Sequence, residues 1–227
     1  MNDSSAGVAI VLGARNLGGA VAEHLQAEGW RVAAVARSED TLAKVRDGGM
    51  LAIEADASEP ASLDAAIAQA REELGPPGLL VNAVSASRPP RQGGPFGGGP
   101  IADAGVEDFR GWAAAVAEQA FVFLSSGIRA LRQSGGGTLI QFTGGSSRRA
   151  MPARGLWSAG ASGVRAITHA AAQEVRQEGI HVALLIVDAT IESPKTEAFT
   201  RGKPREELAD QRLIAEAVSY LASQEPR

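Results

Sequence analysis

Short apolar runs alternate along this chain with longer segments in which apolar residues recur every three or four positions. Continuous apolar runs are typical of strands buried on both faces of a sheet, and the longer spacing is typical of helices. The predicted strands cover residues 8–12, 31–36, 50–55, 79–83, 138–143 and 181–187. The predicted helices cover residues 18–28, 58–74, 106–133, 158–178 and 205–223.

Strands that alternate with helices predict an α/β fold, in which helices cover both faces of a parallel sheet. Right-handed crossovers then give a doubly wound, Rossmann-type arrangement of three layers, α/β/α, with ligands bound beyond the carboxyl ends of the strands. We expect a single domain, because 227 residues, 44% of them apolar, suffice for one large core. The loops at 87–99 and 191–204 are expected either to overhang this crevice or to serve as connectors.

The amino-acid composition argues against several kinds of functional site. The chain has no cysteine, which excludes disulfides, thiol catalysis and cysteine-ligated zinc. Its histidines, His24, His169 and His181, have no metal-ligand spacing, so we expect no metal. The net charge is −4 and the positive charges are scattered, so we expect no nucleic-acid partner. The N-terminus lacks a basic region and the run at 8–12 is too short to span a membrane, which favours a cytoplasmic protein.

The turn after the first predicted strand has the features of a phosphate-binding loop. It reads Leu-Gly-Ala-Arg-Asn-Leu-Gly over residues 12–18 and leads into a helix. Backbone N–H groups and the helix dipole at such a turn can hold a pyrophosphate. Glycines also end strands for other reasons, so the pattern gains weight only from its place in an alternating α/β chain. The candidate cofactor residues here are Gly13, Arg15, Asn16, Leu17 and Gly18.

The end of the second predicted strand favours one nucleotide over another. Arg37 and Ser38 stand where a carboxylate would receive the ribose hydroxyls of NAD. A guanidinium instead matches a 2′-phosphate with two parallel hydrogen bonds, and Arg15 would add a second positive charge. We therefore expect NADP(H) rather than NAD, the alternative being two solvated surface arginines.

Polar residues also follow the third and fourth predicted strands. Asp56, with Ala57 after it, is placed to accept a hydrogen bond from an adenine amino group, or simply to begin a helix. Asn82, Ala83 and Val84 would line the ribose side of the crevice, or simply end the strand.

In this order and at these intervals, the chain resembles the short-chain dehydrogenase/reductase family over essentially its whole length. The turn at 12–18 is similar to that family's Thr-Gly-x-x-x-Gly-x-Gly: Gly18 keeps the last glycine, whereas Leu12 and Asn16 replace the first and the middle ones. Asp56 matches the adenine-contacting aspartate, and residues 81–84 resemble the Asn-Asn-Ala-Gly stretch with its glycine lost. Arg15 and Arg37 stand where NADP-preferring members carry basic residues.

The catalytic half departs from the family. Its Tyr-x-x-x-Lys motif aligns with Trp157 and Ala161, and its serine aligns with Gly144. Its asparagine falls near Glu118 or Gln119. No shift of the alignment restores the motif, since the only tyrosine is Tyr220 and the lysines are Lys44, Lys195 and Lys203. We expect no intact catalytic set, with Thr143 and Ser146 as candidate substitutes.

The resemblance thus implies an NADP(H)-binding, oxidoreductase-like protein with a degenerate catalytic site. Any activity would be carbonyl/alcohol or double-bond redox on an unidentified small molecule. The alternative is a non-catalytic NADP(H) sensor or interaction module, and Arg37 disfavours a methyltransferase. The family also implies a homodimer or homotetramer through the long helices near 106–133 and 158–178, and a seventh strand that is not evident here.

Overall fold

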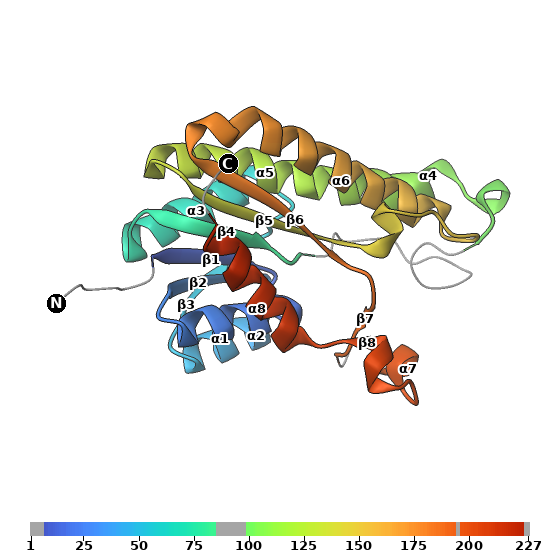
Figure 1. The fold of residues 1–227 in the computed structure, drawn as a ribbon, viewed down its shortest axis with the longest axis horizontal. Helices are drawn as coiled ribbons and strands as arrows, with labels where there is room; N and C mark the ends of the chain where they lie inside the picture. The colour runs from blue at the N-terminus through green and yellow to red at the C-terminus, as the bar shows by residue number, and fades with distance from the viewer. Residues whose placement is uncertain (1–6, 85–98, 194–195, 225–227) are drawn as a thin grey trace.

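The central feature is a parallel sheet of six strands in the order β3-β2-β1-β4-β5-β6 (Figure 1). The computed structural model describes residues 7–84, 99–193 and 196–224. The strands are β1 (Val8–Leu12), β2 (Arg31–Ala36), β3 (Leu51–Glu54), β4 (Pro77–Asn82), β5 (Gly137–Gly144) and β6 (Ile180–Val187). The chain reverses its direction of travel across the sheet between β1 and β4, which is where such folds place their ligand crevice. The predicted doubly wound α/β class is confirmed.

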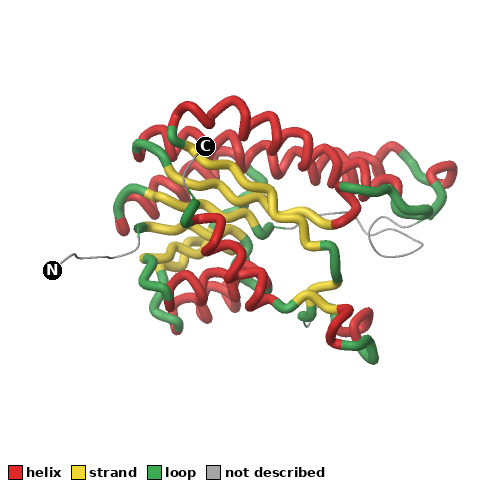
Figure 2. Tube along the Cα trace, in the orientation of Figure 1, coloured by secondary structure: helices red, strands yellow, loops and turns green. Residues whose placement is uncertain are grey.

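Helices cover both faces of the sheet, and alternate strand residues face the two layers (Figure 2). Ile10 and Leu12 point toward one layer, whereas Ala9 and Val11 point toward the other, as a strand requires. The first layer contains α3 (Pro60–Leu74), α5 (Ala115–Ser134) and α6 (Gly155–Val175). The second contains α1 (Leu17–Ala27), α2 (Glu39–Asp47) and α8 (Gln211–Ala222).

The helices differ from the prediction at several points; among them, the helix predicted at 158–178 begins earlier, at Gly155, and ends at Val175. The helix α2 was not expected, because its apolar face is reduced to Leu42 and Val45 among charged residues. The helix predicted from residue 58 begins at Pro60, with Glu59 as its N-cap residue. The predicted helix at 205–223 is shorter: α8 is preceded by a turn of 3₁₀ helix, η5 (Arg205–Glu207), and by β8 (Leu208–Ala209), which pairs with β7 (Thr190–Ile191).

The predicted helix at 106–133 is interrupted near its start. It consists of α4 (Val106–Phe109), a π-helical turn η2 (Arg110–Ala114) and then α5. Among the described residues, only this segment, Val106–Ser134, is long and apolar enough to cross a membrane by composition. However, 56% of its most apolar window is buried, and α5 packs against α6, β4 and β5. Core packing therefore accounts for its apolar character.

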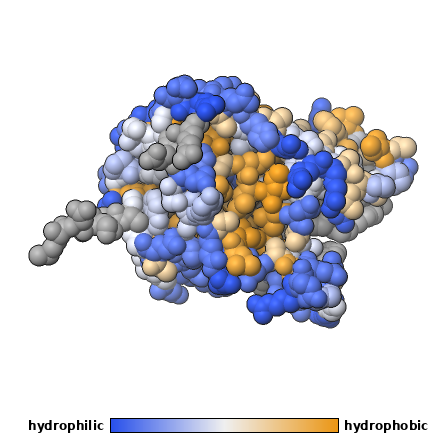
Figure 3. Space-filling model, in the orientation of Figure 1, coloured by the Kyte–Doolittle hydropathy of each residue, from blue (hydrophilic) through white to orange (hydrophobic). Residues whose placement is uncertain are grey.

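Of the two expected loops, most of the second, at 191–204, belongs to the described residues. Apart from Gly99, the loop at 87–99 lies outside the described residues. The segment after β6 forms β7, α7 (Glu197–Thr200) and β8, which stand apart from the main sheet beyond the carboxyl end of β6 (Figure 1). Within the described residues the sheet ends at β6, whose last residues, 184–187, are only half-buried. Figure 3 shows an apolar surface over this part of the molecule.

Candidate functional site

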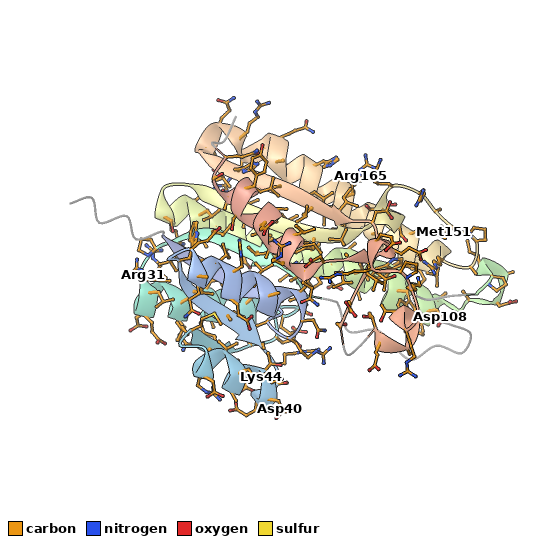
Figure 4. The ribbon with its side chains drawn as sticks, turned by 60° about the horizontal axis from the view of Figure 1, so that its bottom comes forward. Arg31, Asp40, Lys44, Asp108, Met151 and Arg165 are labelled. Carbon is orange, nitrogen blue, oxygen red and sulfur yellow. The ribbon has the colours of Figure 1, made fainter. Side chains whose placement is uncertain are left out.

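The carboxyl ends of the strands gather at one end of the molecule. In Figure 4, Arg31, the first residue of β2, lies at the opposite end from Met151, in the loop after β5. All the residues expected to bind a cofactor or to replace a catalytic group lie at the carboxyl ends of β1 to β5 or at the start of α1 or α6.

The turn between β1 and α1 is pressed against the end of β4. Gly13 has φ +86°, and a Cβ atom there would lie 2.9 Å from the carbonyl carbon and oxygen of Ala83. A Cβ atom on Gly18 would lie 2.4 Å from the carbonyl oxygen of Gly13 and 3.2 Å from the Cβ of Ala83. Only glycine fits at these two positions without displacing backbone. Gly13 and Gly18 of the predicted phosphate-binding loop thus lie against Ala83, which follows β4.

The same turn leaves the start of α1 open. Asn16 is the N-cap residue, but its side chain makes no capping hydrogen bond. The first N–H groups of the helix therefore lack a side-chain acceptor, at the end where the helix dipole is positive. Arg15 is exposed beside them, and Leu17 is buried under the first turn. This arrangement can hold an anion such as a phosphate.

Arg37 and Asp56 form an ion pair across the ends of β2 and β3. Their Nη1 and Oδ2 atoms are 3.3 Å apart. The backbone N–H of Ser58 donates to Asp56 Oδ1 at 2.9 Å, and this bond is the largest cause of the lowered pKa of Asp56. Burial raises that pKa by less than this bond lowers it, while a hydrogen bond to the Ser58 side chain and the charge of Arg37 lower it further. Asp56 is therefore a carboxylate at neutral pH.

Ser38, expected at the cofactor site, has a structural role as well. Its Oγ accepts a hydrogen bond from the backbone N–H of Thr41 at 3.3 Å, which caps the start of α2. A serine at this position stabilises the helix start whether or not a ligand is present. Ser38 and Arg37 nevertheless lie together at the carboxyl end of β2.

A buried cluster of three side-chain amides stands behind the crevice. Asn82 Nδ2 donates to Gln119 Oε1 at 3.0 Å and to Gln141 Oε1 at 2.8 Å. Asn82 Oδ1 accepts from the backbone N–H of Val84 at 3.2 Å, and Gln119 Nε2 donates to the carbonyl oxygen of Ala57 at 3.5 Å. The cluster thus ties β4, β5 and α5 to two loops of the crevice. The side-chain atoms of Asn82 are used in these hydrogen bonds. The opening of the crevice is therefore lined by the backbone of Ala83 and Val84.

Sequence reasoning singled out Asn82 but missed this cluster. The sequence feature that could have revealed the cluster is a side-chain amide in an otherwise apolar segment, as at Gln119 in α5 and Gln141 in β5. Gln119 is 3% exposed, whereas the neighbouring Glu118 is exposed. Of the two residues near which the family asparagine falls, Gln119 is therefore the one that faces the protein interior.

The positions that carry catalytic groups in the resembled family hold no titratable side chain. Gly144 ends β5 opposite Val187 of β6. Trp157 lies in the first turn of α6 with its ring edge-on to Trp112, at a centroid distance of 6.4 Å and an angle of 78°. Ala161 is 1% exposed and packs in the interior.

Two hydroxyl groups lie beside this region. Thr143 is in β5, and Ser146 is in the 3₁₀ turn η3 (Gly145–Ser147) that follows it. Among the described residues, neither hydroxyl makes a hydrogen bond, and both residues are half-buried. They are polar and available, but an unperturbed serine or threonine hydroxyl is a poor acid near neutral pH.

A carboxylate that the sequence did not single out lies at the end of β6. Asp188 follows Val187, and its Oδ1 occupies the space that a Cβ on Gly145 would need, at 1.7 Å. Its Oδ2 is 3.7 Å from Nη2 of Arg149. Asp188 is thus the titratable side chain that approaches the Gly144–Gly145 pair most directly in the described structure.

Comparisons with known proteins bear on the family and the fold of the chain. A family model described as enoyl-(acyl carrier protein) reductase matches residues 11–227. Among solved structures, the chain is similar to a phenylalanine-to-tryptophan variant of actinorhodin polyketide ketoreductase with NADPH, at 24% identity and a TM-score of 0.79. That alignment covers 98% of this chain and 92% of the ketoreductase chain. No curated protein sequence matches the chain.

Proposed function

Because the chain belongs to the short-chain dehydrogenase/reductase family, we propose that it is an NADP(H)-binding, oxidoreductase-like protein whose usual proton-transfer residues have been replaced. The observation that carries the proposal is the close approach of Gly13 to Ala83, which opens the uncapped start of α1 toward the crevice. Glycine at this contact lets a pyrophosphate approach the backbone. The crystallised ketoreductase relative, whose structure contains NADPH, supports the same choice of cofactor.

The choice of NADP(H) over NAD rests on Arg37. Its guanidinium lies at the end of β2, where the adenosine ribose binds in folds of this kind. The side chain is 59% exposed, and its ion pair with Asp56 is a surface pair that contributes at most about 1 kcal/mol. Arg37 can therefore turn from Asp56 to a 2′-phosphate at little cost. Arg15 supports the same choice with a second positive charge.

The replaced residues reduce what the chain can do chemically. In the family's reaction, nicotinamide supplies hydride to a carbonyl carbon while an acid supplies a proton to the oxygen. The Trp157 indole N–H can donate a hydrogen bond but cannot titrate, and Ala161 provides no charge. General acid–base catalysis typically raises the reaction rate by roughly 10² to 10⁴-fold, which corresponds to lowering the activation free energy by about 3 to 5.5 kcal/mol. Positioning of substrate and cofactor remains available, so any carbonyl or enoyl reduction would take its proton through Thr143, Ser146 or water.

A second candidate is a non-catalytic NADP(H) sensor or interaction module. Three positions favour this candidate: Gly144, Trp157 and Ala161. Their residues pack within the fold but have no side chain that can act as the acid of the reaction. The two candidates share the cofactor and differ only in turnover.

Calorimetric titration separates these proposals. We expect NADPH and NADP⁺ to bind with lower Kd than NAD⁺, and S-adenosylmethionine not to bind. The absence of dinucleotide binding would overturn the proposal, and tight S-adenosylmethionine binding would favour a methyltransferase instead. NADPH oxidation with a panel of ketones and enoyl compounds is the second step. Turnover that is lost in Thr143→Val or Ser146→Ala, but retained in Trp157→Phe, would favour the enzyme; binding without turnover would favour the sensor.

We also propose that the protein is a cytoplasmic homodimer or homotetramer assembled through α5 and α6. Phe121 on α5 is 60% exposed, and an interface through this helix would remove its apolar side chain from water. Part of the small-residue pattern of α6 has a different cause, because Gly160 and Gly163 pack against η2 and α5 of the same chain. Sedimentation of Phe121→Glu tests the assembly: we expect a smaller species than the unmodified protein, and an unchanged mass would contradict the interface.

A further inference from the structure

Two arginines and a carboxylate line a hollow at the carboxyl ends of β5 and β6. The lining residues are Arg148, Arg149 and Asp188. Asp188 Oδ2 lies 3.7 Å from Arg149 Nη2, whereas the Arg148 guanidinium has no hydrogen-bonding or ionic partner within the described part of the chain. The described lining residues therefore carry a net charge of about +1, and the guanidinium donors of Arg148 have no partner among the described residues.

The loop that carries these arginines is held by hydrogen bonds at its base. Ser147 Oγ donates to the carbonyl oxygen of Gly144 at 2.8 Å, and Arg148 N–H donates to that of Gly145 at 2.9 Å. Arg165 of α6 donates from Nη1 to the carbonyl oxygen of Ser147 at 3.4 Å. The backbone positions of both arginines are thus fixed before any ligand binds, which lowers the entropic cost of binding.

Gly145 allows Asp188 to take part in this arrangement. The Asp188 carboxylate lies over the Cα atom of Gly145, where a Cβ would be 1.7 Å from Oδ1. Any larger residue at position 145 would push the carboxylate away. In its present position the carboxylate holds Arg149 at the side of the hollow, so that Arg148 and Arg149 both face it.

From these contacts we infer that the hollow binds the carboxylate group of an organic acid, and, resting on the proposed function, that this acid is the substrate or regulatory ligand of the crevice. The planar guanidinium of Arg148 matches a carboxylate with two parallel hydrogen bonds. A cationic ligand would be repelled by the net positive charge. Asp188 at this hollow contacts Gly145, which directly precedes Ser146 in the chain, so a ligand anchored there would lie near the candidate redox site.

Hexanoate is a suitable probe, because Asp188 at the hollow directly follows the half-buried apolar residues 184–187 of β6. We expect saturable binding of hexanoate to the full chain by calorimetry or NMR, and at least tenfold weaker binding of hexanol. Arg148→Ala should raise the hexanoate Kd about tenfold or more, since a charged hydrogen bond is lost. Arg148→Lys should be intermediate. The matched control is Arg176→Ala, the same charge change in the 3₁₀ turn η4 (Arg176–Glu178) at the opposite end of β6.

The outcomes separate this inference from the proposed function. NADP⁺ binding that is unchanged in Arg148→Ala, together with the loss of hexanoate binding, supports both. No saturable hexanoate binding, or equal effects of Arg148→Ala and Arg176→Ala, overturns the carboxylate site even if NADP⁺ binds. Hexanoate binding that depends on Arg148 without NADP⁺ binding overturns the proposed function and leaves the carboxylate site standing.

Discussion

Arg37 Nη1 lies 3.3 Å from Asp56 Oδ2, so that the residues after two neighbouring strands are joined by an ion pair at the opening of the crevice. Both side chains are more than one-third exposed, at 59% and 37%. Such a pair is weak enough to be exchanged for a bound phosphate. The ion pair therefore holds Arg37 near the cofactor site, and Arg37 can still leave Asp56 to bind a phosphate.

Arg37→Asp should change the preference for the cofactor. It removes a charged hydrogen-bonding group and places a second carboxylate beside Asp56, so we expect the NADP⁺ Kd to rise about 10- to 100-fold. The NAD⁺ Kd should change by less than about threefold, because NAD⁺ has no 2′-phosphate. Arg31→Asp, at the opposite end of β2, is the charge-matched control (Figure 4). Equal losses for the two dinucleotides would refute the role of Arg37.

Stability should depend on pH through Asp56. Its pKa is lowered in the folded state, first by the Ser58 backbone N–H, so its ionised form stabilises the protein above the ordinary value of 3.8. That contribution is lost as the pH falls through the lowered pKa. Asp56→Asn keeps an acceptor for Ser58 but removes the charge. We expect it to reduce the free energy of unfolding by under about 1 kcal/mol near neutral pH, with the difference shrinking below about pH 5. Urea denaturation at several pH values measures this, and a difference that grows on acidification would contradict it.

Gly13→Ala should be far more damaging than a change at another glycine with positive φ. It combines φ +86° with a Cβ only 2.9 Å from the backbone of Ala83, so we expect a loss of about 2 kcal/mol or more. Gly29 has φ +91°, but a Cβ added there would meet no atom within 4 Å, so Gly29→Ala should cost only about 1 kcal/mol. Chemical denaturation of both variants gives the comparison. Similar losses would show that backbone strain, rather than the contact with β4, requires glycine at position 13.

Gln119→Met should destabilise the fold by about 1 to 3 kcal/mol. The change removes both hydrogen bonds between Asn82 and Gln119. Asn82 keeps its bonds to Gln141 and to the Val84 backbone, but one of its side-chain N–H groups loses its acceptor in the interior, where the desolvation of that group is not compensated. The matched control is Gln133→Met on the same helix, which breaks a single exposed bond to Arg71 and should cost no more than about 0.5 kcal/mol. The free energy of unfolding of each variant is the measurement, and equal values would contradict a stabilising role for the amide cluster.

Local patterns predicted most of the backbone architecture. The six strands of the main sheet were located to within two residues at either end, because strands buried on both faces require unbroken apolar runs, whereas the short strands β7 and β8 were not predicted. The turn from Gly13 to Gly18 was recognisable because only glycine permits its close contacts. The helix α2 escaped detection because its stability comes from a serine cap and two buried side chains rather than from a long apolar face.

The sequence by itself determined that α6 contains no tyrosine or lysine, and the proposed loss of the usual proton-transfer residues depends on this fact. It also determined the order of the six strands of the main sheet along the chain and most of the helices between them. Only the tertiary structure decided which distant side chains meet. Asn82 and Gln141 are 59 positions apart yet hydrogen-bonded, and Asp188 folds onto Gly145 from a different strand. The reason is physical: apolar periodicity reports which face of an element is buried, whereas polar contacts depend on which strands become neighbours in the sheet.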